Sequence, residues 1–188
     1  MVCCPEVVSA VDAEEGGWIR AFTNVVRFKV VWRATTREHR RPNPLLPFRN
    51  FSPALKSLSV IPGTLSSLQV FNFVCSFPLL EDLTVLNDGS DGIDEEDQDT
   101  FQPSTSPVFT GTLEVCQGLE YATRRLLDLP NGLHFREIVC ELFLEEDVQY
   151  AMALVERCSG TLEHLNIHQW SVAGKLDTLS LRRDPRMA

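Results

Sequence analysis

The sequence predicts an α/β fold, a short solenoid with parallel strands on one face and helices on the other. Two observations lead to this prediction. A short apolar motif recurs along the 188 residues, and helix-forming segments lie between several of its copies. A unit of this size cannot bury its apolar face alone, so neighbouring units are expected to stack with their strands side by side.

The motif has an apolar residue, a second three positions later and a third two positions after that. Clear copies are Leu55, Leu58 and Val60; Leu80, Leu83 and Val85; and Leu162, Leu165 and Ile167. Weaker copies begin at Val25, Thr110 and Phe135. Within each copy the last three positions alternate as in a strand with one buried face. Most steps between copies fall near the period of about 20–29 residues that defines leucine-rich repeats, so the solenoid is expected to be leucine-rich-repeat-like.

Three segments between the copies are helix candidates. Leu144 to Cys158 has acidic residues near its start, Arg157 near its end and apolar residues at helical spacing, which together favour an amphipathic helix. A second helix is predicted from about Leu119 to Leu129, before Pro130. Leu68 to Phe77 is very apolar and fits a buried helix, although a strand remains open. A last strand is predicted over 176–181.

Charge is distributed unevenly, although the formal net charge is −9. The charged residues of segment 20–49 are mostly Arg and Lys, whereas those of segment 81–99 are all Asp and Glu. Residues 87–107 are rich in Asp, Gly, Ser and Pro, which predicts an acidic flexible loop inserted into a repeat domain of residues 18–181. Residues 1–17 are then an N-terminal extension, and residues 182–188 form a polar C-terminal tail.

Several phrases of the sequence resemble the repeat region of fungal F-box proteins with leucine-rich-repeat-like domains. They are Phe51–Leu58, Val74–Thr84, Leu126–Phe135 and Met152–Ser159 followed by Thr161–Leu165, and the resemblance covers residues 18–170. It implies a protein-protein interaction module like the substrate-recognition region of an F-box ubiquitin-ligase adaptor. Residues 1–17 show no F-box, so docking of a cullin-type ligase adaptor is expected only if an F-box exists upstream. The alternative is a truncated or orphan repeat domain without a ligase role.

Solenoids present an extended concave surface built from strand residues, which suits a protein substrate or partner. We therefore predict partner binding at the outward positions of the three clear motif copies. These residues are Ser57, Ser59, Asp82, Thr84, His164 and Asn166.

No pattern in the sequence points to catalysis, a cofactor or a metal, and we do not expect an enzyme. Hydrolase-elbow and phosphate-binding glycine motifs are absent. His164 and His168 have the spacing of a helical zinc pair, but they flank a predicted strand, where that spacing loses its meaning. Cysteines occur without a Cys-x-x-Cys pair, and those at 75, 116, 140 and 158 lie in or beside apolar stretches. Buried free thiols are typical of an intracellular protein of the cytoplasm or nucleus.

Partners other than proteins are less well supported. No apolar run approaches the ~20 residues of a membrane span, and the acidic balance disfavours nucleic acid. Nucleic-acid binding through the basic 20–41 segment remains an alternative, since Trp18, Phe22, Phe28 and Trp32 are interleaved with its arginines. The competing interpretation is that Phe28 belongs to the core of the first repeat, with Arg27 and Lys29 on its solvated side.

Overall fold

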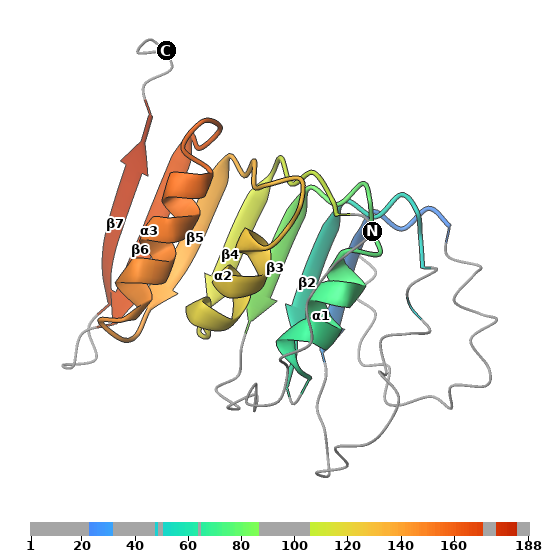
Figure 1. The fold of residues 1–188 in the computed structure, drawn as a ribbon, viewed down its shortest axis with the longest axis horizontal. Coiled ribbons are helices and arrows are strands. Elements are labelled where there is room, and N and C mark those ends of the chain that lie inside the picture. The colour runs from blue at the N-terminus through green and yellow to red at the C-terminus, as the bar shows by residue number, and fades with distance from the viewer. Residues whose placement is uncertain are drawn as a thin grey trace.

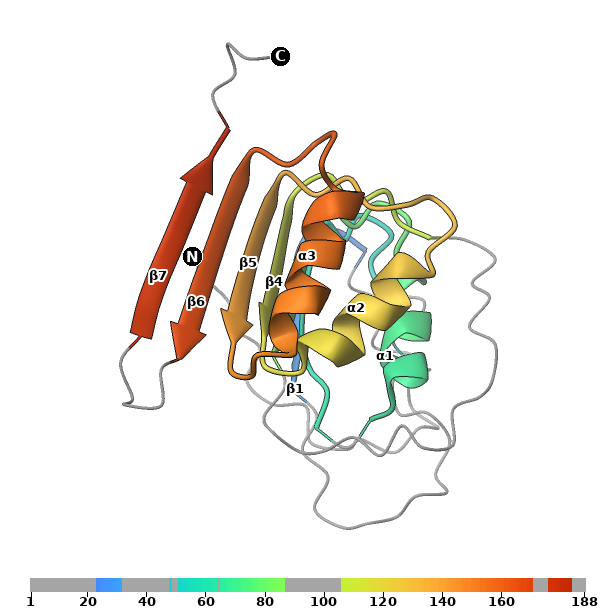
Figure 2. The same cartoon turned by 60° about the vertical axis from the view of Figure 1, so that its left-hand side comes forward.

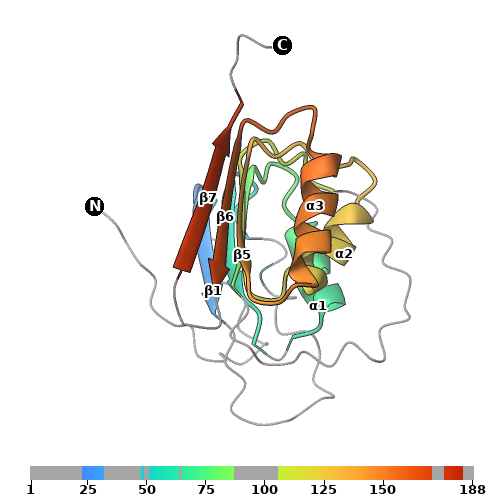
Figure 3. The same ribbon diagram turned by 90° about the vertical axis from the view of Figure 1, so that its left-hand side faces the viewer.

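The computed structural model describes residues 23–31, 48, 51–63, 65–86, 106–170 and 176–183. These residues form an open, mostly parallel seven-stranded sheet whose strands follow one another in chain order. The three helices of the described chain all lie on one side of this sheet (Figures 1 and 3). The predicted α/β class, with strands and helices in separate layers, is confirmed.

The strands are β1 (Arg27–Val31), β2 (Ser57–Ile61), β3 (Asp82–Leu86), β4 (Thr112–Cys116), β5 (Glu137–Leu142), β6 (His164–Trp170) and β7 (Leu176–Arg182). Strands β1 to β6 pair in parallel, as predicted, and each contains the end of one motif copy. The last strand, predicted over 176–181 without a direction, is present as β7 and pairs antiparallel with β6. Only residues 171–175 separate β6 from β7, and a parallel connection needs a crossover of a dozen or more residues.

The motif positions set the register of the sheet. Leu58 pairs with Leu83, Leu83 with Leu113, and Ile138 with Leu165. The same backbone contact recurs ahead of the strands: two successive N–H groups donate to one carbonyl of the preceding copy. Lys56 and Ser57 donate to Val26, and Glu163 and His164 to Arg136, at 2.8–3.0 Å. Neighbouring copies therefore enter the sheet in the same way.

The helices are α1 (Ser67–Val74), α2 (Leu119–Leu127) and α3 (Asp147–Arg157). A capping box decides α1 in favour of a helix: the Ser66 hydroxyl accepts the N–H of Gln69, and the Gln69 side chain accepts the N–H of Ser66. α2 begins at Leu119 as predicted and ends two residues earlier. α3 begins three residues later than predicted, because the Asp147 carboxylate accepts the N–H groups of Phe143 and Leu144 in the preceding turn.

The core lies between the sheet and the helix layer. Phe109 and Phe135 stack there with ring centroids 4.8 Å apart, and both are fully buried. Cys75, Cys140 and Cys158 are also buried, as predicted. The prediction is wrong for Cys116, which is only half-buried because it follows the inward Val115 by one residue and so faces the other side of the strand.

Several predicted segments fall largely outside the described residues. They are the extension 1–17, most of the acidic loop, most of the basic segment and most of the tail 182–188. At the end of the predicted acidic loop, Ser106 and Pro107 are buried instead, and the Asn131 side chain donates to the Ser106 carbonyl at 2.9 Å. In the basic segment, Phe28 packs against Phe48 and Phe51 while Arg27 and Lys29 are exposed, which agrees with the core interpretation of Phe28. No helix within the described ranges is long and apolar enough to cross a membrane.

Candidate functional site

One face of the sheet carries no helix of the described chain, and we call it the open face (Figure 3). Alternate residues of each strand point to this face, and the pairing register arranges them in rows across the sheet. One row contains Arg27, Ser57, Asp82, Thr112, Glu137, His164 and Arg182; the next contains Lys29, Ser59, Thr84, Glu114, Val139, Asn166 and Ser180. All but one of these side chains are polar. The third row, at the carboxyl ends of the parallel strands, contains Val31, Ile61, Leu86, Cys116, Glu141, His168 and Thr178. The open face is therefore polar along two rows and apolar along the third on β1 to β4, where these four side chains are half-exposed.

All six residues predicted for partner binding lie on the open face, each half-exposed. Ser57 and Ser59 on β2 pair with Asp82 and Thr84 on β3, so these four are contiguous. His164 and Asn166 lie on β6, with β4 and β5 between them and the other four. The structure therefore places the six residues in two groups, and whether they bind a partner remains a prediction.

The residues between these two groups were missed by the sequence reasoning. They are Thr112 and Glu114 on β4 and Glu137 and Val139 on β5. A signal for them was present, because the weaker motif copies at Thr110 and Phe135 alternate in the same way as the clear ones. Applying the outward-position rule to every copy would have predicted a continuous surface.

A chain of side-chain hydrogen bonds links the strands β4 to β7 on the open face. The Thr112 hydroxyl donates to Glu137 Oε2 at 3.3 Å, and the Asn166 amide donates to Glu137 Oε1 at 3.1 Å. The Ser180 hydroxyl in turn donates to Asn166 Oδ1 at 2.6 Å. Four strands, β4 to β7, are linked in this way, which restricts the positions of these polar side chains.

Carboxylates dominate the centre of the open face. Asp82 accepts the backbone N–H of Thr112 at 2.8 Å, and Glu114 accepts the Thr84 hydroxyl at 3.2 Å. Together with Glu137 and Glu141 they occupy β3 to β5, and none of the four forms an ion pair with another described residue. Neighbouring negative charges create a negative potential that attracts cations.

Cationic side chains lie towards the two ends of the same face. Arg27 and Lys29 stand on β1, and Arg182 stands on β7, all three exposed. Lys56, just before β2, forms an ion pair with Glu81, just before β3, at 2.7 Å. The hydrogen bond and charge of Glu81 raise the pKa of Lys56 above its ordinary value. The open face thus has an acidic centre between basic ends.

The open face also carries a cysteine and two histidines, Cys116, His164 and His168. Burial, and to a lesser degree Glu141 and Glu114, raise the pKa of the Cys116 thiol to about 12, so it stays protonated and is a weak nucleophile. His168 Nδ1 lies 3.1 Å from the Thr178 hydroxyl. Within the described ranges no group of three or more His, Cys, Asp or Glu is arranged to hold a metal.

In the described residues, fold and surface define an open α/β protein with its helices on one side and a mostly polar sheet face on the other. Comparisons with protein-family models, with curated proteins and with solved structures found no match. The open face is therefore the feature from which function is inferred.

Proposed function

We propose that this chain is a protein-protein interaction module that binds its partner across the open face. The observation that carries the proposal is a mostly polar sheet face over seven strands, hydrogen-bonded through its side chains from β3 to β7, with no described helix above it. Small substrates bind in concave, mostly apolar pockets that enclose them. A broad, mostly polar sheet face suits the extended surface of another protein better.

The repeat architecture supports this proposal. We propose that the fold is a short leucine-rich-repeat-like solenoid, because the motif copies share one register and one backbone contact ahead of their strands. In solenoids the strands of successive repeats make one continuous binding surface. Residues of several repeats, from Ser57 on β2 to Asn166 on β6, would then contact the same partner.

The resemblance to fungal F-box proteins suggests which kind of partner this is. On that basis we propose recognition of a protein substrate for a ubiquitin ligase, in the cytoplasm or nucleus. The ligase role depends on an F-box upstream of the repeats, and without one the chain is an orphan repeat domain that binds proteins for another purpose. Binding across the open face is expected in either case.

The charges of the open face indicate the chemistry of the partner. Asp82, Glu114, Glu137 and Glu141 lie at its centre without a described ion-pair partner. A partner segment with Lys or Arg side chains would provide the missing countercharges, and opposite potentials across an interface favour association. Binding should accordingly weaken as the salt concentration rises.

Affinity capture with two charge-matched variants tests the proposal. The open-face variant Glu114→Lys with Glu141→Lys should lose at least about tenfold of the captured partner. The control variant Glu145→Lys with Glu156→Lys makes the same change in net charge on exposed residues of the helix side and should keep it. Extracts treated with nuclease exclude capture through nucleic acid. Equal capture by both variants would contradict the proposal.

A further inference from the structure

β7 is the end strand of the sheet, and no helix of the described chain lies over it (Figures 1 and 2). Leu179 and Leu181 are each 53% exposed. They pair with Ile167 and Leu165, which pack against the core, so all four lie on the helix side of the sheet. Two neighbouring exposed leucines on an edge strand are a surface suited to another strand.

Within the described ranges no strand pairs with the outer backbone of β7. The Arg183 N–H donates to the Glu163 carbonyl of β6 at 2.9 Å. Backbone groups alternate in direction along a strand, so those of Asp177, Leu179 and Leu181 point to β6 as well. The N–H and C=O groups of Thr178, Ser180 and Arg182 then point away from β6, and β7 is the last strand of the sheet.

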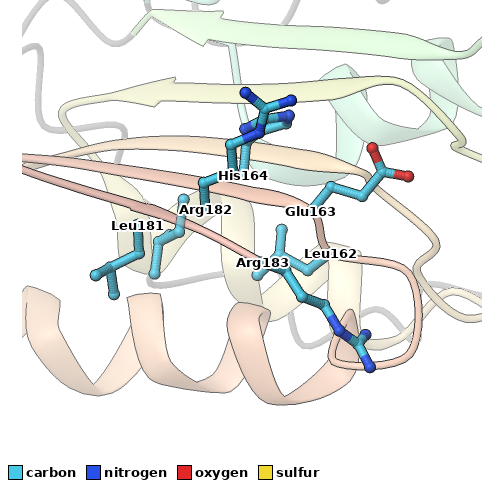
Figure 4. Close-up of a pocket in the computed structure, with 7 residues that line it drawn as sticks. Leu162, Glu163, His164, Leu181, Arg182 and Arg183 are labelled. Atoms are coloured by element: carbon cyan, nitrogen blue, oxygen red, sulfur yellow. The ribbon is translucent and has the colours of Figure 1, made fainter. Parts of the chain in front are cut away.

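The helix-side row of β7 is complementary to itself. It reads Asp177, Leu179, Leu181, Arg183, with one negative end, two apolar residues and one positive end. Turned around in an antiparallel pair, the same row presents Arg183 opposite Asp177 and Leu181 opposite Leu179. Figure 4 shows Leu181 and Arg183 on the helix side and Arg182 with His164 on the other side.

We propose that β7 is a homodimer interface, at which a second copy of this chain pairs antiparallel about a two-fold axis through Ser180. Four leucines then meet on the helix side, and two Asp177–Arg183 pairs flank them. Because the axis repeats each contact, every favourable pair occurs twice. On the open face Ser180 of each copy lies opposite Ser180 of the other, and Thr178 lies opposite Arg182, so no like charges meet.

Other registers are less favourable. A shift of one residue would turn the leucines of one copy to the opposite face. A shift of two residues places Asp177 opposite a leucine in one direction, or Leu179 opposite Arg183 in the other. The register centred on Ser180 therefore pairs each helix-side leucine, Leu179 or Leu181, with a leucine and every described helix-side charge with its opposite.

Sedimentation velocity of the full chain over a wide range of concentration tests this interface. The expected result is a reversible change from a 21.2 kDa monomer to a species of twice that mass. In a dimer of Asp177→Arg, the new arginine of each copy lies opposite Arg183 of the other, at both ends of the interface. In a dimer of Arg183→Asp, the new aspartate of each copy lies opposite Asp177 of the other. Each variant should weaken self-association by roughly tenfold or more. Both positions are exposed, so the core is unaffected.

A mixing experiment separates this geometry from any other association. An equimolar mixture of the two variants restores opposite charges at every position and should form a one-to-one heterodimer. The double variant with both changes should again form homodimers. If the wild-type chain stays monomeric at every concentration, the proposal is overturned. The β7 edge would then pair with another segment of the chain or with another protein. Association that ignores both charge reversals, or a mixture that fails to associate, would overturn the proposal as well.

Discussion

The Asn166 side-chain amide donates a hydrogen bond to Glu137 Oε1 across 3.1 Å, joining β6 to β5 on the open face. Asn166 is one of the residues that the sequence analysis predicted for binding, and Glu137 is one that it missed. The same asparagine accepts the Ser180 hydroxyl from β7. A single side chain thus links three strands, which makes it a sensitive probe of the surface.

We predict that Asn166→Ala lowers the free energy of unfolding by about 1–2 kcal/mol, because one half-buried and one exposed hydrogen bond are lost. Asn166→Asp should cost more, since it places a second carboxylate beside Glu137. Urea denaturation at neutral pH measures both values. An Asn166→Asp variant as stable as the wild type would disprove the hydrogen bond.

Gly111 packs against the residue that anchors the start of β4. A Cβ atom at this position would collide with the Asp82 carboxylate, which accepts the Thr112 N–H, and would crowd the Glu81 carbonyl. Gly111→Ala should therefore lower the free energy of unfolding by about 1–3 kcal/mol. Gly160→Ala, where a Cβ meets open space, should change it by less than about 0.5 kcal/mol. Equal effects in urea denaturation would show that Gly111 is not so confined.

The buried thiols should make the protein less stable at alkaline pH. Burial raises the pKa of Cys75 and Cys140 from an ordinary value of 9.0 to about 12. Between these pH values the unfolded thiols ionise while the folded ones stay protonated, so the unfolded state is favoured as pH rises. Below pH 9.0 both states are protonated, and this contribution to stability is fully retained.

Cys140→Ala isolates one of these thiols. The free energy of unfolding should fall less steeply with pH in this variant than in the wild type, by at most about 1.4 kcal/mol per pH unit. Urea denaturation in reducing buffer from about pH 8 to about pH 10.5 spans the ionisation range. Ser59→Ala removes no ionisable group and should keep the wild-type slope. Identical slopes for Cys140→Ala and the wild type would contradict the raised pKa.

The strands were predictable because each motif copy alternates inward and outward residues, and the pairing of Leu58 with Leu83 and of Ile138 with Leu165 follows that alternation. The direction of β7 was not, since an alternating pattern reads the same in a parallel and in an antiparallel strand. Its short connection to β6 held the missing information. Similarly, the capping box of Ser66 and Gln69 identifies α1 as a helix where apolar content alone does not.

The open face was predicted only in part for a related reason. The apolar residues that define a repeat are the buried ones. A copy with fewer apolar residues is therefore a weaker signal, even when its outward residues are charged. Glu114 and Glu137 belong to such copies. Cys116 was assigned to the interior by residue type, whereas its position next to Val115 turns it outward.

The central claim is that a partner protein lies against the open face. Photo-crosslinking tests it most directly, with a photoreactive amino acid placed at Ser59 on β2 and, for comparison, at Glu156 on the helix side. Both positions are accessible, Ser59 being half-exposed and Glu156 exposed. We expect a crosslinked partner from Ser59, with a yield that falls when chain without the photoreactive group is added, and no crosslinked partner from Glu156. Crosslinks from Glu156 alone would contradict it.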